Sequence, residues 1–283
     1  MIIGIYRLTN IVAMRVAVKF AYDGTSFHGY QRQPDVRTVE GELVKALISL
    51  GAIDSTQNSI FRSSSRTDSG VSAIGNVFAL NTEFRPEVLP QALNSKVQDI
   101  WVWGYAPVSE DFNPRHATQR WYRYYFSSEV DSEALRGASR QFIGEHNFAL
   151  FAQRDERSTI RRIDTIEVTK NGNFTILDIV GESFLRGMIR KIAWAMEHLA
   201  SGLLTMREVE RALRGKGGGF GTAPSEPTVL MDVRYGFDFI VPPKIKETLA
   251  LQLEKRIWER RLSQEILSVI LSRSLQNRIR SIG

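Results

Sequence analysis

The segment SSSRTDSGV, residues 63–71, sets two reactive side chains in a run of small polar residues. Asp68 offers a carboxylate that can accept a proton or act as a nucleophile. Arg66 offers a planar cation two residues earlier. Asp, Ser and Gly also form turns, because Asp and Ser hydrogen-bond to the local backbone and Gly accepts a positive φ. By itself the segment therefore fits a plain turn as well as a reactive loop.

Three other segments interleave cations with aromatic rings. They are FHGYQRQ at 27–33, RWYRYYF at 120–126 and FLRGMIRK at 184–191. Their polar members include Gln31, Arg32, Arg186, Arg190 and Lys191. Arg186 and Arg190 are four residues apart in a segment expected to be helical, so we expect them to share one face of that helix. Cations hold phosphates and aromatic faces stack bases, which is the combination that RNA-binding sites need. Each segment alone also fits a strand with buried rings or a helix with solvated arginines.

The motifs of other catalytic classes are absent from the sequence. GKGGGFGTAP, residues 215–224, fails as a phosphate-binding loop because Gly217 follows Lys216 and no strand precedes it. A loop is expected there. No GxGxxG opens a helix after a strand, so a nicotinamide or flavin cofactor is not expected. The chain has no Cys and its four His lack paired spacing, so no metal site is expected.

Composition narrows the partners and the location. Lys and Arg number 37 against 31 Asp and Glu, which gives a net charge of +6 and favours a polyanionic partner. The absence of Cys suits a reducing compartment, so a cytoplasmic location is expected. No run approaches about 18 uncharged apolar residues, so no membrane span is expected. The first 14 residues lack the basic region of a signal peptide, and Met14 is an alternative start.

Sequence patterns predict an α+β chain. In the first half, residues 15–22 alternate as a half-buried strand, Thr38 caps an amphipathic helix, and Pro86 suits the first turn of another helix. Further strands are expected near 59–63, 76–80 and 100–107. In the second half we expect strands at 118–126 and 229–235, a hairpin around Asn171-Gly172, and helices at 132–143, at 183–202 and after the capping box at Thr205.

We therefore predict two similar subdomains, 14–110 and 111–236, with mixed or antiparallel sheets flanked by helices and a catalytic cleft between them. Residues 242–283 form a separate basic helical extension with apolar residues near helical spacing. Three interpretations of this extension stay open. It packs on the body with a solvated charged face, it contacts nucleic acid, or it packs against a second copy of the chain.

Taken together in this order, five segments resemble the TruA family of tRNA pseudouridine synthases. YDGTSFHGYQRQ with TVEGEL resembles the N-terminal signature of that family, and SSRTDSGVSAIGNV resembles its catalytic loop. RWYRYYF resembles the strand that bears the family tyrosine, SFLRGMIRKI its Met-x-Arg helix, and TAPSEPTVLMDVRY its closing segment. The resemblance covers about Met14 to Tyr235. Ser72, where many bacterial members have His, and Glu226-Pro227-Thr228 in the closing segment are similar to the archaeal branch.

The resemblance implies the pseudouridine synthase fold and roles for particular residues. Asp68 is implied as the catalytic carboxylate, Arg190 as its ion-pair partner, and Tyr122 as the residue that stacks on the target uracil. Substrate-binding roles are implied for Arg66, Gln31, Arg32, Arg186, Lys191 and Tyr122. A guanidinium beside Asp68 favours the ionised carboxylate. Arg66 is placed to fill the stack that a flipped uridine leaves.

The resemblance also implies a substrate, a cofactor requirement and an assembly. The family substrate is uridine at positions 38–40 of the tRNA anticodon stem-loop, and the reaction uses no cofactor. Members act as homodimers, with the RNA crossing both subunits, so a homodimer is expected here. Two alternatives stay open at this point. The chain is a pseudouridine synthase for another structured RNA, or a non-catalytic RNA-binding protein on the same scaffold.

Overall fold

The computed structural model describes residues 13–126, 130–153 and 158–280. The expectations about a signal peptide and about the start at Met14 concern the first residues, of which 1–12 lie outside the described part. The described chain divides into two compact units, a body that ends at Ile240 and a tail that begins at Val241. No helix in the described ranges is both long enough and apolar enough to cross a membrane.

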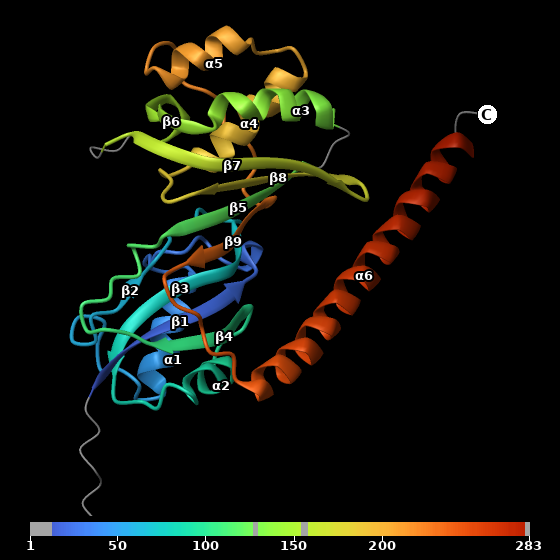
Figure 1. Ribbon diagram of the computed structural model, residues 1–283. Helices are drawn as coiled ribbons and strands as arrows, with labels where there is room; N and C mark the ends of the chain where they lie inside the picture. Colours follow the sequence, from blue (N-terminus) through green and yellow to red (C-terminus); the bar gives the residue numbers. More distant parts are fainter. Residues whose placement is uncertain (1–12, 127–129, 154–157, 281–283) are drawn as a thin grey trace, which may run out of the picture. The chain divides into compact units, whose positions relative to one another are not determined.

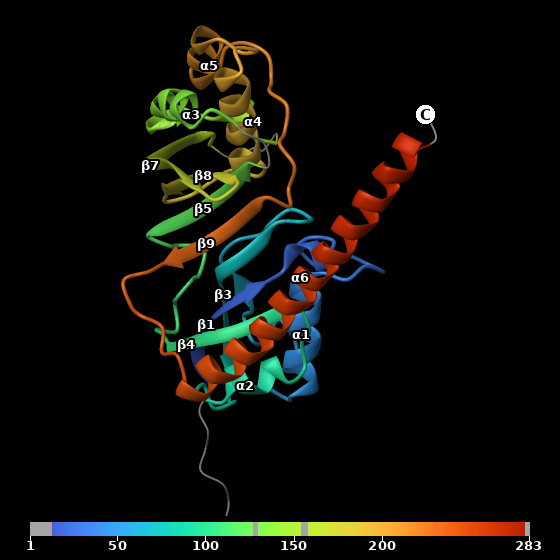
Figure 2. The same cartoon turned by 90° about the vertical axis from the view of Figure 1, so that its right-hand side faces the viewer.

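The body is built on one mixed sheet of nine strands (Figures 1 and 2). The strands are β1 (Met14–Tyr22), β2 (Arg62–Ser63), β3 (Ser72–Thr82), β4 (Ile100–Pro107), β5 (Gln119–Phe126), β6 (Gly144–Asn147), β7 (Ile160–Asn171), β8 (Phe174–Gly181) and β9 (Thr228–Arg234). Their order is β4-β1-β3-β9-β5-β8-β7-β6, with β2 paired to β3 outside this path. This mixed sheet confirms the predicted α+β class.

The sheet narrows where the two halves of the body meet. β3 and β9 run parallel and pair at only two positions, Ser72 with Val229 and Ala73 with Leu230. All other strand pairs of the described body are antiparallel. β9 then pairs with β5 over most of its length. A short parallel bridge therefore joins two antiparallel portions into one sheet.

A separate hydrophobic core lies in each portion. The first core joins β1, β3 and β4 to the helices α1 (Val39–Ser49) and α2 (Leu89–Asn94). The second joins β5, β7 and β8 to the helices α3 (Ser132–Ser139), α4 (Met188–Ala200) and α5 (Met206–Leu213). Figure 1 shows α3, α4 and α5 gathered at the β7–β8 end of the sheet and α1 and α2 at the β4 end. Tyr122 of β5 packs against both cores.

Local sequence signals account for several element boundaries. The Thr38 side chain accepts a hydrogen bond from Gly41 N and caps α1, and Thr205 with Glu208 forms the predicted capping box of α5. The Asn171-Gly172 turn joins β7 to β8, as the hairpin signal predicts. The predicted strand at 100–107 coincides with β4. Residues 215–224 form no helix or strand apart from a bridge nearby, as expected for a loop.

One strand is more buried than the alternation predicts. β1 was expected to be half-buried, yet every residue from Arg15 to Phe20 is buried. The charged side chains of this strand are buried because they form hydrogen bonds and an ion pair with residues distant in the sequence. Arg15 donates to Asn81 Oδ1 at 2.8 Å and to a main-chain carbonyl, and Lys19 pairs with Asp232 at 2.5 Å. Hydrogen bonds and ion pairs offset the free energy that removing a cation from water costs.

Two predicted helices begin later than expected. The helix predicted at 183–202 begins at Met188, because Gly187 takes a left-handed φ of 73° and Arg186 lies outside the helix. The prediction that Arg186 and Arg190 share one face of a helix is therefore wrong. The helix expected to begin at Pro86 begins at Leu89, with Pro90 in its first turn, where a missing N–H costs no hydrogen bond.

The tail consists of one long helix, α6 (Pro243–Arg280). Residues 241–283 contain nine Lys and Arg against four Glu, a net charge of +5, so residues 1–240 carry only +1 of the total of +6. Many of its large apolar side chains are exposed, among them Leu251, Ile257 and Trp258. These apolar residues are spread around the helix instead of forming one stripe. The basic character of the chain thus resides mainly in the tail.

Candidate active site

The loop that carries Asp68 is fastened on two sides. On one side it lies against residues 29–30, where Tyr30 N donates to Thr67 O at 3.1 Å. Gly29 has a φ of 97°, which residues with a side chain rarely adopt, and a Cβ there would lie at the ordinary contact distance of 3.4 Å from Ser69 N. On the other side the turn touches the closing segment, since a Cβ on Gly70 would lie 2.7 Å from Ser225 Oγ. The small residues of the loop therefore serve close packing of the backbone.

Buried hydroxyl and amide groups of β1 and β3 form hydrogen bonds to the loop. Asn76 of β3 is fully buried and donates to Ser65 O at 3.0 Å. The hydroxyls of Tyr22 and Thr67 lie 2.8 Å apart. Burial raises the pKa of Tyr22 well above its ordinary value, so this phenol stays neutral and keeps its hydrogen bonds. These contacts fix the backbone on either side of Arg66.

Arg120 of β5 holds the same loop from the second core. Its side chain is 7% exposed and donates through Nε to Ser65 Oγ at 3.1 Å and through Nη2 to Ser64 O at 3.4 Å. It also donates to the carbonyls of Arg115 and Glu182, at 2.9 and 2.5 Å. A guanidinium can make five hydrogen bonds in a fixed plane, which suits this bridging position.

Two guanidinium groups contact the Asp68 carboxylate. Arg190 Nη1 of α4 donates to Asp68 Oδ2 at 3.0 Å, and Arg186 Nε lies 3.5 Å from Oδ1. The Asp68 and Arg190 side chains are 17% and 21% exposed, whereas Arg186 is 72% exposed. Solvent therefore screens the Arg186 contact strongly, and Arg190 is the main electrostatic partner. Arg186 reaches Asp68 from the non-helical turn before α4.

Arg190 is itself held by the C-terminal end of the glycine-rich loop, residues 215–224. Its Nε donates to Ala223 O at 2.8 Å, and its carbonyl accepts from Ala223 N. The neighbouring Lys191 donates to Phe220 O at 2.6 Å. Lys191 thus fastens the loop at 215–224 to α4, and the structure does not bring it to Asp68. The glycine-rich loop contributes to the site by orienting Arg190.

Tyr122 lies on β5 near the Asp68 loop. It pairs with Leu230 of β9, and its ring meets Phe184 edge to face at a centroid distance of 5.4 Å. Burial raises the pKa of the Tyr122 phenol, Arg120 and a hydrogen bond with Ser65 lower it, and the charge of Asp68 raises it further. The phenol is therefore protonated at neutral pH and can donate or accept a hydrogen bond.

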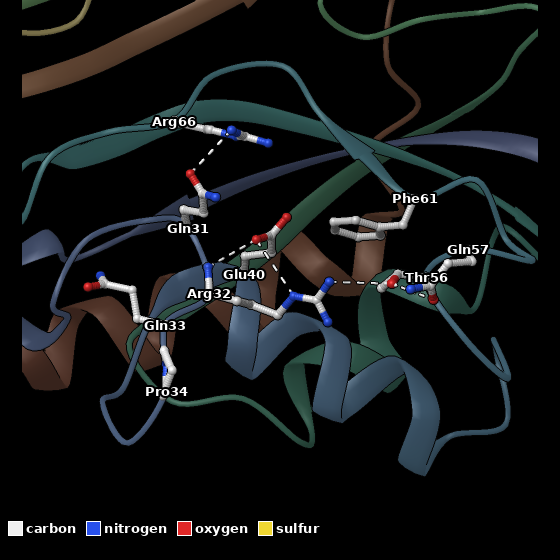
Figure 3. Close-up of a pocket in the computed structure, with 9 residues that line it drawn as sticks. All are labelled: Gln31, Arg32, Gln33, Pro34, Glu40, Thr56, Gln57, Phe61 and Arg66. Atoms are coloured by element: carbon white, nitrogen blue, oxygen red, sulfur yellow. Dashed lines mark hydrogen bonds and ion pairs between the residues drawn. The ribbon is translucent and has the colours of Figure 1, made fainter.

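The remaining predicted residues lie beside the loop. Arg66 Nη1 donates to Gln31 Oε1 at 3.2 Å, and both side chains are exposed. Arg32 pairs with Glu40 at 3.7 Å. All three line a cavity that Figure 3 shows in close-up. The structure thus gathers Asp68, Arg186, Arg190 and Tyr122 at one place, and Arg66, Gln31 and Arg32 at an adjoining one.

Sequence reasoning did not single out Arg120 or Asn76. Both residue types are common, and neither has a spacing that distinguishes it from a solvated side chain. Their importance follows from burial together with partners at distant positions, which a single sequence does not display. Phe184, whose ring contacts Tyr122, does lie in the FLRGMIRK segment, but this contact depends on where α4 begins.

Comparison with known proteins gives the context of this arrangement. The family described as tRNA pseudouridine synthase matches residues 138–236. A relative from Pyrococcus horikoshii, named tRNA pseudouridine synthase A, is 42% identical over 87% of this chain and 95% of its own. The chain belongs to the TruA family of tRNA pseudouridine synthases. A relative of the same name from Methanosarcina mazei is 38% identical over 91% of this chain and 99% of its own.

Membership of the TruA family makes the chain an isomerase with the pseudouridine synthase fold. A solved Cbf5-Nop10-Gar1 complex aligns at a TM-score of 0.36 and 14% identity, over 76% of this chain and 48% of that one, and the family assignment rests on the sequence relatives instead. Within the described ranges, no cluster of three or more His, Cys, Asp or Glu could hold a metal ion.

Proposed function

We propose that this TruA member isomerises uridine to pseudouridine at positions 38–40, in the anticodon stem-loop of tRNA. The observation that carries the proposal is the Asp68 carboxylate held by Arg190 beside the Tyr122 ring. The resemblance of their segments to the catalytic loop, the tyrosine strand and the Met-x-Arg helix of the TruA family supports these three roles. The relatives named tRNA pseudouridine synthase A support tRNA as the substrate.

The reaction rearranges bonds without any net redox change. The C1′–N1 glycosidic bond breaks, the uracil turns, and a C1′–C5 bond forms. The proton on C5 is lost and N1 gains a proton, so atoms and charge balance. In this proposal Asp68 acts at C1′, C2′ or C6 as nucleophile or base. Arg190 orients the carboxylate through Oδ2, and the substrate would approach Oδ1 by displacing the exposed Arg186, whose Nε lies 3.5 Å away.

Tyr122 would stack on the uracil and take part in moving the C5 proton. An aromatic face suits stacking, and a phenol with a raised pKa stays protonated until it meets a base. Arg66 would fill the space left by the flipped uridine, whose unstacking from a stem costs a few kcal/mol. Its exposed guanidinium, anchored only to Gln31 among the described residues, can reach such a position.

Two measurements test the proposal. Mapping pseudouridine in tRNA incubated with the purified chain should find it at positions 38–40, and its formation at other sites would redirect the proposal to another structured RNA. Asp68→Asn should abolish turnover while leaving tRNA affinity within a few fold, because the substitution keeps size and polarity but removes the charge. Wild-type turnover by this variant would contradict the catalytic assignment of Asp68.

We further propose that the chain acts as a homodimer in the cytoplasm, as the family resemblance and the Cys-free composition suggest. A homodimer would let one tRNA contact both subunits, which lengthens the basic surface available to the phosphates. Sedimentation velocity of the purified protein should give twice the chain mass. A monomer that remains fully active would contradict this part of the proposal.

A further inference from the structure

The cavity beside the Asp68 loop is lined by Arg66 but not by Asp68, Arg190 or Tyr122. It measures about 550 Å³, within the roughly 300–1,000 Å³ typical of ligand pockets. Its lining comes from residues 31–34 and from Thr56, Gln57 and Phe61, together with Glu40 and Arg66. Figure 3 shows these side chains around one space, with Arg66 and Gln31 on one side and Phe61 on the other.

An aromatic ring with a fixed orientation forms one wall. Phe61 stacks on Phe78 at a centroid distance of 5.2 Å and an interplanar angle of 28°. Phe78 is fully buried in the first core, so it covers one face of the Phe61 ring and holds it in place. Figure 3 shows the Phe61 ring directed toward Glu40 and Arg32. A flat apolar ring held beside polar groups is the surface on which bases stack.

Polar groups of the lining can pair with the edge of a base. Glu40 Oε2 accepts from Arg32 N at 3.0 Å, and Glu40 Oε1 has no hydrogen-bond partner among the described residues. The amide nitrogens of Gln31 and Gln57 also have no hydrogen-bond partner among the described residues. The amide oxygens of these two residues accept from Arg66 and Thr56. One free acceptor with two free donors matches the adjacent donor and acceptor that every standard base presents on its pairing edge.

The charges around the cavity match a single nucleotide. Arg32 and Arg66 are exposed cations, and Glu40 is a half-buried anion, so the lining carries a net charge of +1. One phosphodiester group carries −1. Arg32 is held in place by Glu40 and by Thr56, at 3.7 and 3.4 Å, which leaves part of its guanidinium fork for a phosphate.

We propose that this cavity binds one unstacked nucleobase of the substrate RNA, a neighbour of the target uridine in the chain. The base would stack on Phe61 and pair along its edge with Glu40 and Gln57, while the rim arginines hold its phosphate. Because Arg66 belongs both to this cavity and to the Asp68 loop, the RNA would be gripped at two adjoining points. The proposal rests on the proposed function, which supplies the RNA and its target uridine.

Variants of the lining test the proposal by steady-state kinetics on an anticodon stem-loop RNA. Phe61→Leu keeps an apolar side chain against Phe78 but removes the flat face, and should raise KM roughly tenfold with little change in kcat. Gln57→Ala, an exposed change, should raise KM about two- to tenfold. Asn58→Ala lies on the same loop outside the cavity and should leave KM unchanged. Wild-type KM for both cavity variants would overturn the proposal.

A scan of abasic substitutions in the RNA identifies the bound base. At one position beside the target uridine, removing the base should raise KM for the wild-type chain. With that abasic RNA, the wild-type chain and Phe61→Leu should have the same KM. A Phe61→Leu penalty that persists with every abasic RNA would show that the ring acts on folding instead, and would overturn the proposal. If the unchanged chain forms no pseudouridine in tRNA, the proposed function fails, and Kd values for the same RNAs and variants still decide about the cavity.

Discussion

Replacing Arg120 by Met should damage catalysis more than binding. Arg120 is a buried cation whose described hydrogen-bond partners are one hydroxyl and three carbonyl oxygens, none of them a carboxylate. Two of these acceptors, Ser64 O and Ser65 Oγ, belong to the loop that carries Asp68. Methionine keeps the length and the apolar stem of the side chain but removes every donor. The loop would then lose the hydrogen bonds by which Arg120 connects it to β5.

The magnitude follows from the four hydrogen bonds. Bonds from a charged donor are worth about 1.5–3 kcal/mol each, while burying the cation costs several kcal/mol. The net loss of unfolding free energy should be about 3 kcal/mol. For a chain of this size about 1 kcal/mol corresponds to roughly 2–4 °C in Tm, so Tm should fall by about 10 °C. A displacement of the carboxylate by about 1 Å should lower kcat on the order of 100-fold.

A matched substitution separates loop positioning from general stability. Arg123 lies on the same strand and pairs with Asp178 at 2.8 Å, away from the Asp68 loop. Arg123→Met should also lower Tm, but kcat measured below the transition should stay near wild type. Arg120→Lys, which retains donors without the planar fork, should fall between wild type and Arg120→Met. Wild-type kcat for Arg120→Met, or equal losses of kcat in Arg120→Met and Arg123→Met, would refute the reasoning.

Three further outcomes are expected. Arg66→Ala should lose more activity on a stem uridine than on an unpaired one, because flipping costs less there, and equal losses would argue against a wedge role. Burial raises the pKa of Tyr124 and Tyr235 to about 12, so their contribution to stability is complete below about pH 10 and is lost as the pH rises through 12. The part of the tyrosinate absorbance that is lost in Tyr124→Phe and Tyr235→Phe should therefore rise together with unfolding, and its appearance at pH 10 in the folded chain would contradict this. Truncation after Pro243 removes a net charge of +5. It should raise KM for tRNA and make KM less dependent on salt, without changing kcat. An unchanged KM with a lower Tm would show that the tail has a structural role instead.

Local signals in the sequence were sufficient for much of the fold. The bounds of β4, the caps at Thr38 and Thr205 and the turn at Asn171-Gly172 depend on neighbouring residues, so one segment contains all the information. The burial of β1 was not predictable in this way. Alternation indicated one exposed face, but Arg15 and Lys19 are covered by partners on distant segments, among them Asn81 and Asp232.

The candidate site was predictable to a similar degree. Family resemblance pointed to Asp68, Arg190 and Tyr122, but the spacing of Arg186 and Arg190 suggested a shared helical face that Gly187 prevents. Arg186 reaches Asp68 all the same, from the turn before the helix. Positive φ at a glycine depends on the tertiary contacts around it, so a helix start that hinges on Gly187 is not determined by local propensity.

The short parallel bridge between β3 and β9 has a consequence for the way activity arises during folding. Asp68 belongs to the portion of the chain with the first core, whereas Tyr122 and Arg190 come from the portion with the second. A partly folded molecule with one core complete would possess either the carboxylate or its guanidinium and phenol partners, never the full set. Under the roles proposed for these three residues, RNA is modified only by a chain whose two halves have both folded and docked, so turnover reports complete tertiary assembly.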